Sequence, residues 1–309
     1  MKTALITHEA CIAHQTPPGH PEHSGRLESV LAALHASEFS ALSRHEAPRA
    51  ETSALARVHD INYIDEVLSS IPQSGYVQFD SDTYGSPGTG EAVLRAAGAV
   101  IMGVDLVMKG EVKNAFCAVR PPGHHALSSQ AMGFCLFNNV AVGAWHARAA
   151  YGITRVAVID FDVHHGNGTQ AMFYSDPELF YASTHQSPLY PGTGQRFETG
   201  VADNILNLPL PPGSGGVQLR AAFETALLPA LRRFKPELIL ISAGFDAHRD
   251  DPLAQLRLDE KDFFWATEQI CAVARDICQG RVVSTLEGGY DLAALARSAE
   301  SHVRALMAA

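Results

Sequence analysis

The chain has 309 residues, of which 46% are hydrophobic and 18% charged, so it can bury a large core and is neither disordered nor fibrous. Its 23 basic and 33 acidic residues give a formal net charge of −10, which disfavours nucleic-acid binding and leaves a cationic substrate open. Five scattered cysteines without a C-x-x-C pair predict neither disulfides nor a cysteine zinc site. The N-terminal residues do not resemble a signal peptide, and no apolar run approaches the ~20 residues of a membrane span, so we expect a cytoplasmic protein without a membrane partner.

Short apolar runs alternate with longer alanine-rich segments, the pattern of parallel βαβ units. In chain order, the predicted strands are 5–7, 115–119, 156–159, 179–182, 238–241 and 282–286. The predicted helices are 26–36, 90–109, 140–150, 219–234, 261–279 and 292–307. Asn138 and Asn139 can cap the start of one helix, and three helix ends are marked by Gly110, Gly152 and Gly280. No repeat or linker divides the chain, so we predict one α/β domain over residues 1–309.

Loops rich in glycine and proline follow the predicted strands and carry polar or aromatic residues. They lie at 121–123, 166–168, 191–194 and 288–289. Ligands of an open parallel sheet bind beyond the carboxyl ends of its strands. The sequence therefore predicts a functional site along that edge.

The predicted strand 156–159 runs directly into Asp160, Asp162 and His164. Side chains alternate along an extended chain, so these three can project to one side. Asp246 follows the predicted strand 238–241. Together, Asp162, His164 and Asp246 would give a catalytic zinc ion three protein ligands and leave room for water and substrate. Fe²⁺, Co²⁺ and Mn²⁺ suit the same ligand types. Taken alone, such residues fit helix capping equally well.

A histidine pair, His124 and His125, follows the predicted strand 115–119 through a stiff turn. Beside a metal and its water, such a pair suits general acid–base catalysis, although an isolated pair is more often structural. Tyr290 follows two glycines after the last strand, where its hydroxyl can approach the metal and donate to an oxyanion. Most tyrosines in such a context only pack.

These motifs resemble, in order and composition, those of the histone deacetylase family, especially its class II branch and the bacterial histone deacetylase-like amidohydrolases. They are RPPGHHA at 120–126, GFCLFNN at 133–139, DFDVHHGNG at 160–168, PGTG at 191–194, GFDAHRDDP at 244–252 and LEGGY at 286–290. The resemblance extends from His20 to Asp291. It implies the arginase/deacetylase fold, a single three-layer domain with a central, mostly parallel sheet of about eight strands.

The resemblance also implies the roles of the acid–base residues. His125 would be the general base and acid, while His124 would act mainly through its charge. Asp160 would hydrogen-bond His124, and Asn167 would hydrogen-bond His125. Many class I relatives carry aspartate at the second place, and a neutral amide stabilises imidazolium less, so we expect His125 to lose its proton more easily here.

The remaining site residues are likewise implied by the resemblance. Zinc would be held by Asp162, His164 and Asp246, and Tyr290 would stabilise the transition state. Gly133 would lie beside a narrow tunnel whose two aromatic walls are Phe134 and Tyr190, where relatives commonly have phenylalanine in the second place. Leu253 matches a rim position at which polyamine-selective relatives carry glutamate, so acyl-lysine is the favoured substrate.

Family members also bind potassium, which the sequence alone would not indicate. The resemblance implies one site from Asp160, Asp162, His164, Ser183 and Thr184, and a second from Phe173, Asp176, Leu179 and Asn204. Three further histidines near the predicted site, His165, His185 and His248, are assigned structural hydrogen bonds rather than ligation.

The predicted function is a zinc-dependent amidohydrolase that removes acetyl or other acyl groups from N-ε-acyl-lysine or similar acylated amines. An acetylpolyamine amidohydrolase is the first alternative, because it would use the same metal site. A ureohydrolase of the arginase type would need a two-metal cluster. A non-catalytic acyl-lysine-binding module would not need the acid–base residues. A homo-oligomer is left open.

Overall fold

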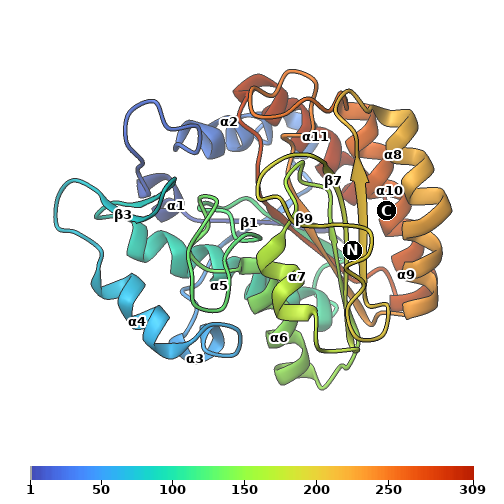
Figure 1. Ribbon diagram of the computed structural model, residues 1–309, viewed down its shortest axis with the longest axis horizontal. Helices are drawn as coiled ribbons and strands as arrows, with labels where there is room; N and C mark the ends of the chain where they lie inside the picture. The colour runs from blue at the N-terminus through green and yellow to red at the C-terminus, as the bar shows by residue number, and fades with distance from the viewer. Residues whose placement is uncertain (1) are drawn as a thin grey trace.

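Eight parallel strands form the centre of the molecule. The computed structural model describes residues 2–309 (Figure 1). From one edge to the other, the strands are β2 (Ser43–Glu46), β1 (Thr3–Thr7), β5 (Asn114–Cys117), β10 (Val282–Leu286), β9 (Leu238–Ala243), β6 (Val156–Asp160), β7 (Leu179–Gln186) and β8 (Ile205–Leu210). Every neighbouring pair in this sheet is parallel. A separate antiparallel hairpin is formed by β3 (Val77–Asp80) and β4 (Thr83–Gly85).

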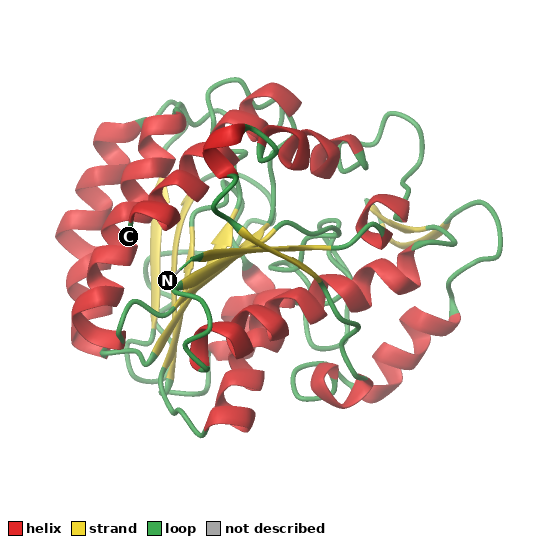
Figure 2. Cartoon of the chain, turned by 180° about the vertical axis from the view of Figure 1, so that it is seen from behind, coloured by secondary structure: helices red, strands yellow, loops and turns green. Residues whose placement is uncertain are grey.

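Helices cover both faces of the sheet and complete three layers (Figures 1 and 2). One layer contains α2 (Gly25–Ala33), α8 (Gly216–Ala222), α9 (Leu228–Phe234), α10 (Glu260–Cys278) and α11 (Leu292–Ala308). The opposite side carries α1 (Ala10–Ala13), α5 (Thr89–Met108), α6 (Asn139–Tyr151) and α7 (Asn167–Phe173), with α3 (Thr52–Leu55) and α4 (Ile61–Ser69) farther from the sheet. A 3₁₀ turn covers Ser37–Phe39. The predicted single α/β domain is confirmed for the described residues, which share one hydrophobic core.

All six predicted strands are present, with ends that differ by at most four residues. Sequence analysis missed the two strands of the hairpin and, in the large sheet, β2 and β8, which are its edges. The polar sequence of β2 alternates half-buried and exposed positions, so no apolar run marks it. β8 contains Pro209, which cannot donate to a ladder and is tolerated in an edge strand.

The predicted helix 219–234 is not continuous. It is divided by a π-helical turn, Phe223–Leu227, between α8 and α9. Pro229 stands at the start of α9 and has no backbone N–H to donate to the preceding turn, which accounts for the irregularity. Among the predicted caps, Asn138 accepts a hydrogen bond from the Ala141 N–H, and α6 ends at Gly152 in the left-handed conformation. The corresponding residue at the end of α10 is Gln279, one position before the predicted Gly280.

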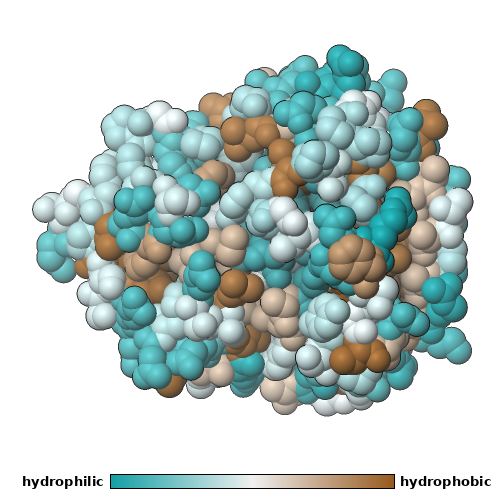
Figure 3. Space-filling model, in the orientation of Figure 1, coloured by the Kyte–Doolittle hydropathy of each residue, from teal (hydrophilic) through white to brown (hydrophobic). Residues whose placement is uncertain are grey.

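Apolar side chains are concentrated inside. The most exposed of the large hydrophobic side chains are Phe197 and Val217, and Figure 3 shows hydrophobic groups interspersed with hydrophilic ones on the face drawn. Within residues 2–309, the structure has no helix with the length and apolarity needed to cross a bilayer.

The order of the central strands determines where the functional loops meet. β5, β10, β9 and β6 are consecutive neighbours, although they come from four distant parts of the chain. Because all four run in the same direction, the loops beyond their carboxyl ends gather at one edge.

Candidate active site

Three metal-binding side chains converge at that edge. Asp162 and His164 come from the loop after β6, and Asp246 comes from the loop after β9. One ligand atom from each lies within 4.8 Å of the other two. His164 Nδ1 is 3.2 Å from a carboxylate oxygen of Asp162 and 3.1 Å from one of Asp246. A histidine nitrogen with two carboxylates is a ligand set that suits a catalytic zinc ion.

The backbone fixes the two carboxylates of this group. The Gly288 N–H donates to Asp162 at 2.8 Å, and the Val163 N–H donates to Asp246 at 2.8 Å. A Cβ atom on Gly288 would lie 2.0 Å from an Asp246 oxygen, so only glycine permits this approach. These backbone contacts therefore orient the two carboxylates.

The two carboxylates of this group favour a bound cation. Asp162 and Asp246 are almost completely buried, and within residues 2–309 neither forms an ion pair with lysine or arginine. Burial and the charge of Asp162 raise the pKa of Asp246 to about 7. Burial alone would lower the pKa of His164, but hydrogen bonds to both carboxylates raise it to about 10. Two buried carboxylates thus favour positive charge between them, and the three residues fit a divalent metal.

The histidine pair lies beside this group with its two rings in different electrostatic environments. The ring centroids of His124 and His125 are 4.0 Å apart. Burial would lower the pKa of His124, but Asp160 and Asp162 raise it to about 10. Burial lowers the pKa of His125 well below its ordinary value, and the neighbouring His124 and His164 lower it further. At neutral pH, His124 is thus an imidazolium and His125 a neutral base, a separation typical of acid–base pairs.

Each histidine contacts the partner that the family resemblance implies. His124 Nδ1 lies 3.0 Å from Asp160, and His125 Nδ1 lies 2.7 Å from the Asn167 side-chain oxygen. An amide oxygen accepts, so the His125 Nδ1 carries hydrogen and its Nε2 has a free lone pair. Asn167 is the first residue of α7, a helix that sequence analysis did not predict.

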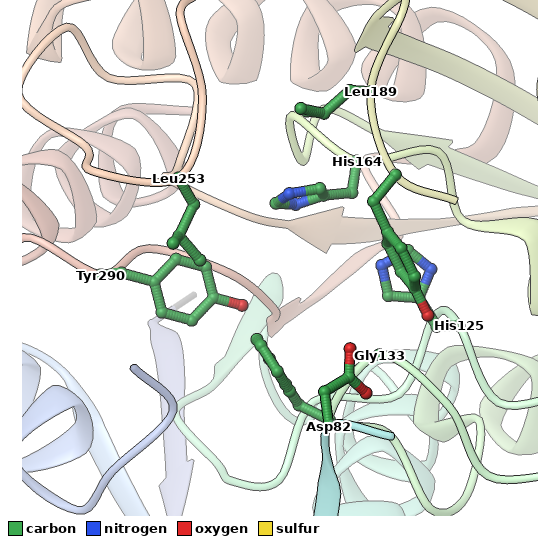
Figure 4. A pocket seen from close by; sticks show the side chains of 9 residues that line it. Asp82, His125, Gly133, His164, Leu189, Leu253 and Tyr290 are labelled. Carbon is green, nitrogen blue, oxygen red and sulfur yellow. The ribbon is translucent and has the colours of Figure 1, made fainter. Parts of the chain in front are cut away.

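These residues border a cavity of about 250 Å³ (Figure 4). Its walls are formed by Asp82, His125, Gly133, Phe134, His164, Leu189, Tyr190, Leu253 and Tyr290. In Figure 4 the Tyr290 hydroxyl points into the space that His125 and His164 border. Burial raises the pKa of Tyr290 well above its ordinary value, with a contribution from Asp246 and Asp162, so the hydroxyl keeps its proton and can donate.

The two aromatic side chains predicted as walls lie on different sides of the catalytic residues. The ring of Phe134 is 5.8 Å from that of Tyr290, and the ring of Tyr190 is 5.3 Å from that of His125. Gly133 packs against His125, since a Cβ there would lie 2.5 Å from the imidazole. Nine predicted site residues therefore meet here: His125, Gly133, Phe134, Tyr190, Leu253 and Tyr290, with His164, line the cavity, and His164 joins Asp162 and Asp246 in the metal group. The predicted His124, Asp160 and Asn167 lie behind them, in contact with the histidine pair.

Comparison with known proteins identifies the family. The histone deacetylase domain model matches residues 20–306. The chain belongs to the histone deacetylase family. It is 39% identical over 308 residues to the chloroplastic histone deacetylase 14 of Arabidopsis thaliana, covering 93% of this chain and 73% of that protein. It is 38% identical to the histone deacetylase-like amidohydrolase of Pseudomonas aeruginosa, covering 94% and 82%. The crystal structure of the HDA15 HD domain matches with a TM-score of 0.94 and 35% identity, over 99% of this chain and 88% of that one.

Sequence analysis missed several residues of this histone deacetylase site. Asp82 and Leu189 line the cavity. Asp82 lies in the turn between β3 and β4, and no motif marked it. Asp251 holds the rim, because its carboxylate accepts from the backbone N–H groups of Tyr290 at 2.7 Å and Leu253 at 3.0 Å. Only the folded chain brings these residues together.

A buried ion network supports the Tyr290 segment. Glu22 accepts hydrogen bonds from Arg26 and Arg120, and all three side chains are completely buried. Burial would raise the pKa of Glu22, but Arg120, His14 and Arg26 hold it well below its ordinary value. The guanidinium of Arg26 lies 4.8 Å from the centre of the Tyr290 ring and donates to the Gly289 carbonyl.

Two predicted structural histidines hold the loop that carries Tyr190. His165 Nδ1 is 2.7 Å from the Thr193 hydroxyl, and His185 Nε2 is 2.9 Å from the Gly194 carbonyl. Burial lowers the pKa of His165 to about 4 and that of His185 to about 3, so both are neutral and hydrogen-bond without charge. The loop that carries the aromatic side chain of Tyr190 is thus held by two buried, neutral histidines.

The two expected potassium sets differ in their fit. In the first, Asp160 of β6 is directly paired with Ser183 of β7, which Thr184 follows in the same strand, while Asp162 and His164 lie in the loop after β6. In the second, the Asn204 side-chain nitrogen lies 3.0 Å from the Phe173 carbonyl, 3.0 Å from that of Asp176 and 2.8 Å from that of Leu179. Its oxygen accepts from the Val201 N–H at 3.1 Å. Asn204 therefore meets the three carbonyls as a donor, and this arrangement does not fit a cation.

Proposed function

We propose that the protein is a zinc-dependent deacetylase that hydrolyses the amide of N-ε-acyl-lysine or a similar acylated amine. One observation carries the proposal: a neutral, oriented histidine, a protonated tyrosine and a three-ligand metal group border the same narrow cavity. Acyl transfer to water needs a base, an oxyanion donor and an electrophile at such a position.

Zinc, held by Asp162, His164 and Asp246, would supply Lewis acidity and make water more acidic. His125 takes a proton from the attacking water at Nε2, because Asn167 occupies its Nδ1–H. The Tyr290 hydroxyl donates to the carbonyl oxygen as negative charge develops there. His125 then returns the proton to the leaving amine, and the positive charge of His124 favours the anionic transition state.

The aromatic walls account for an extended substrate. Phe134 and Tyr190 pack against the aliphatic part of the acylated side chain and exclude water from the reacting amide. Leu253 adds an apolar rim, which favours acyl-lysine. Asp82 lines the same cavity, however, and a carboxylate attracts a second cationic group. For this reason an acetylpolyamine is the second candidate substrate.

A ureohydrolase and a non-catalytic binding module have less support. Among residues 2–309, the metal-binding group found is a single one with three ligands, whereas a ureohydrolase needs two metals. A binding module would not require the acid–base residues. Cytoplasmic location stays a prediction, and the named relatives include a chloroplast protein.

A substrate panel with a matched pair of variants tests the proposal. Metal-replete protein is offered an acetyl-lysine peptide, longer acyl-lysine peptides and acetylated polyamines, with and without a chelator. We expect turnover that chelation abolishes and zinc restores. Tyr290→Phe should keep its zinc and lose roughly 10²–10³-fold in kcat. Tyr151→Phe, which removes a hydroxyl bonded to Asp105 on another part of the molecule, is the control and should leave kcat unchanged. Absence of turnover on every compound, or full activity of Tyr290→Phe, contradicts the proposal.

A further inference from the structure

Glu287 is a completely buried carboxylate next to the site, and the mechanism above does not use it. It follows β10 directly and precedes Tyr290 by three residues. One of its carboxylate oxygens accepts from the backbone N–H of Gly123 at 2.7 Å and from that of His124 at 3.2 Å. The other oxygen accepts from the Ser242 hydroxyl at 3.3 Å. Its side chain thus bonds to the turn that carries the histidine pair.

This carboxylate forms no ion pair with a basic side chain among the described residues. The nearby buried arginines, Arg26 and Arg120, form their ion pairs with Glu22. Arg26 reaches Glu287 only at its backbone carbonyl. Stabilisation of the fold by an ion pair therefore does not explain a buried glutamate here, and its hydrogen bonds to the histidine turn are its main contacts.

The sheet ladder does not reach the histidine turn. The pairing of β5 with β10 ends at Cys117 and Thr285. Beyond that point, the Glu287 side chain is what connects the two neighbouring loops at the His124 peptide. On the other side of the turn, the His124 carbonyl accepts from the Gly168 and Thr169 N–H groups at 3.1 Å each. The His124 backbone is thus held on one side by α7 and on the other by Glu287.

We propose that Glu287 is a positioning residue that sets the distance between the catalytic histidine turn and the Tyr290 hydroxyl. The short segment from Glu287 to Tyr290 carries the oxyanion donor at one end and binds the base-bearing turn at the other. Movement of the histidine turn relative to this segment would misplace either the proton acceptor, His125, or the hydrogen-bond donor, the Tyr290 hydroxyl. A displacement of about 1 Å in an active site can cost roughly 100-fold in rate. The inference rests on the proposed function for the roles of His125 and Tyr290.

Two substitutions separate the reach of this side chain from its charge. Glu287→Gln keeps the length and an oxygen that can accept from both N–H groups, and its amide can donate to Ser242. Glu287→Asp keeps the charge but withdraws it by one methylene from the histidine turn. Burial raises the pKa of Glu287 to about 7, so the neutral form that glutamine imitates is accessible in the native protein. A control is Asn114→Ala, which removes a buried 2.8 Å hydrogen bond to Leu306 at the opposite end of β5.

The experiment measures kcat and KM of zinc-loaded variants on an acetyl-lysine peptide, together with the unfolding midpoint and zinc content. We expect Glu287→Asp to lose about 10–100-fold in kcat with KM within about twofold of wild type. Glu287→Gln should keep kcat within about threefold, and Asn114→Ala should keep kcat whatever its loss of stability. Full activity of Glu287→Asp, or equal losses in the Asp and Gln variants, would overturn the inference.

A spectroscopic readout keeps this test separate from the proposed function. The Nδ1–H protons of His124 and His125 are hydrogen-bonded, so we expect their resonances downfield in histidine-labelled protein. Glu287→Asp should shift or broaden these resonances, and Glu287→Gln should leave them near their wild-type positions. If the wild type hydrolyses none of the acyl compounds, the proposed function fails while the resonances still decide the role of Glu287. Unchanged resonances in Glu287→Asp would refute it.

Discussion

Replacing Asn167 by aspartate should move the acidic limb of the pH–rate profile to higher pH. The Asn167 oxygen lies 2.7 Å from His125 Nδ1, so the substitution puts a negative charge next to the proposed base without changing the size of the side chain. A carboxylate there stabilises the imidazolium form and raises the pKa of His125. The base is then protonated, and inactive, up to a higher pH.

The magnitude follows from the distance. Unit charges about 4 Å apart interact with about 4 kcal/mol at an effective dielectric constant of about 20, which corresponds to about 3 pKa units. The imidazolium of His124 is already paired with Asp160, and solvent in the cavity screens the new charge pair at His125. We therefore expect the pKa of His125 to rise by roughly 1–3 units.

The assay is kcat/KM against pH on an acetyl-lysine peptide, because this ratio reports groups of the free enzyme. Asn167→Ala is the control, since it removes the hydrogen bond without adding charge. It should lower activity and leave the acidic limb at or below its wild-type position. A profile of Asn167→Asp that coincides with wild type, at unchanged zinc content, would refute the assignment of His125 as the base.

Two further predictions concern stability. Glu22→Gln leaves Arg26 and Arg120 without their buried partner and should cost about 3–5 kcal/mol, which for a chain of this length lowers Tm by roughly 5–8 °C in calorimetry. Because the pKa of Glu22 is lower in the folded than in the unfolded chain, the difference in Tm between Glu22→Gln and wild type should be full above pH 4.5 and shrink below it. The control is Glu38→Gln, in an exposed pair with Arg304, which should hardly change Tm. Equal shifts of Tm in both variants would contradict this reasoning. Asn204→Asp turns a donor into an anionic oxygen facing three carbonyls, so its Tm should fall without potassium and rise with KCl more than that of wild type, compared with choline chloride of equal ionic strength. Equal gains in the two proteins would show that the native second set already holds the ion.

Local pattern was sufficient for much of the fold and for singling out the chemically distinctive residues, whose roles were implied by the family resemblance. The six predicted strands are buried apolar runs, and their alternation with helices follows from the 2- and 3.6-residue periods. Asp162, His164 and Asp246 could be predicted because each stands directly after such a strand. His124, His125 and Tyr290 could be predicted for the same reason. At these positions, the residue type and the place after a strand carry the information.

The supporting contacts required the tertiary structure. Asp82 lines the cavity from a hairpin without an apolar pattern, and Glu22 meets Arg120 across 98 residues of chain. Glu287 lies in a recognised motif, but its bonds to Gly123 and His124 depend on β5 and β10 being neighbours. The same holds for Asn204. Its side-chain amide contains an oxygen that could bind potassium, but only the folded structure shows that this oxygen faces the Val201 N–H.

The amino-acid order therefore determines which groups can perform the chemistry and where the strands that carry them begin and end. Strand order, burial and the facing of side chains from distant segments decide which groups are charged and which are held in place. His124 and His125 illustrate this, because they are adjacent and chemically identical, yet the carboxylates of Asp160 and Asp162 raise the pKa of His124 against the effect of burial, whereas burial and the neighbouring His124 and His164 lower that of His125. Such differences arise from through-space electrostatics and desolvation, which depend on the folded arrangement.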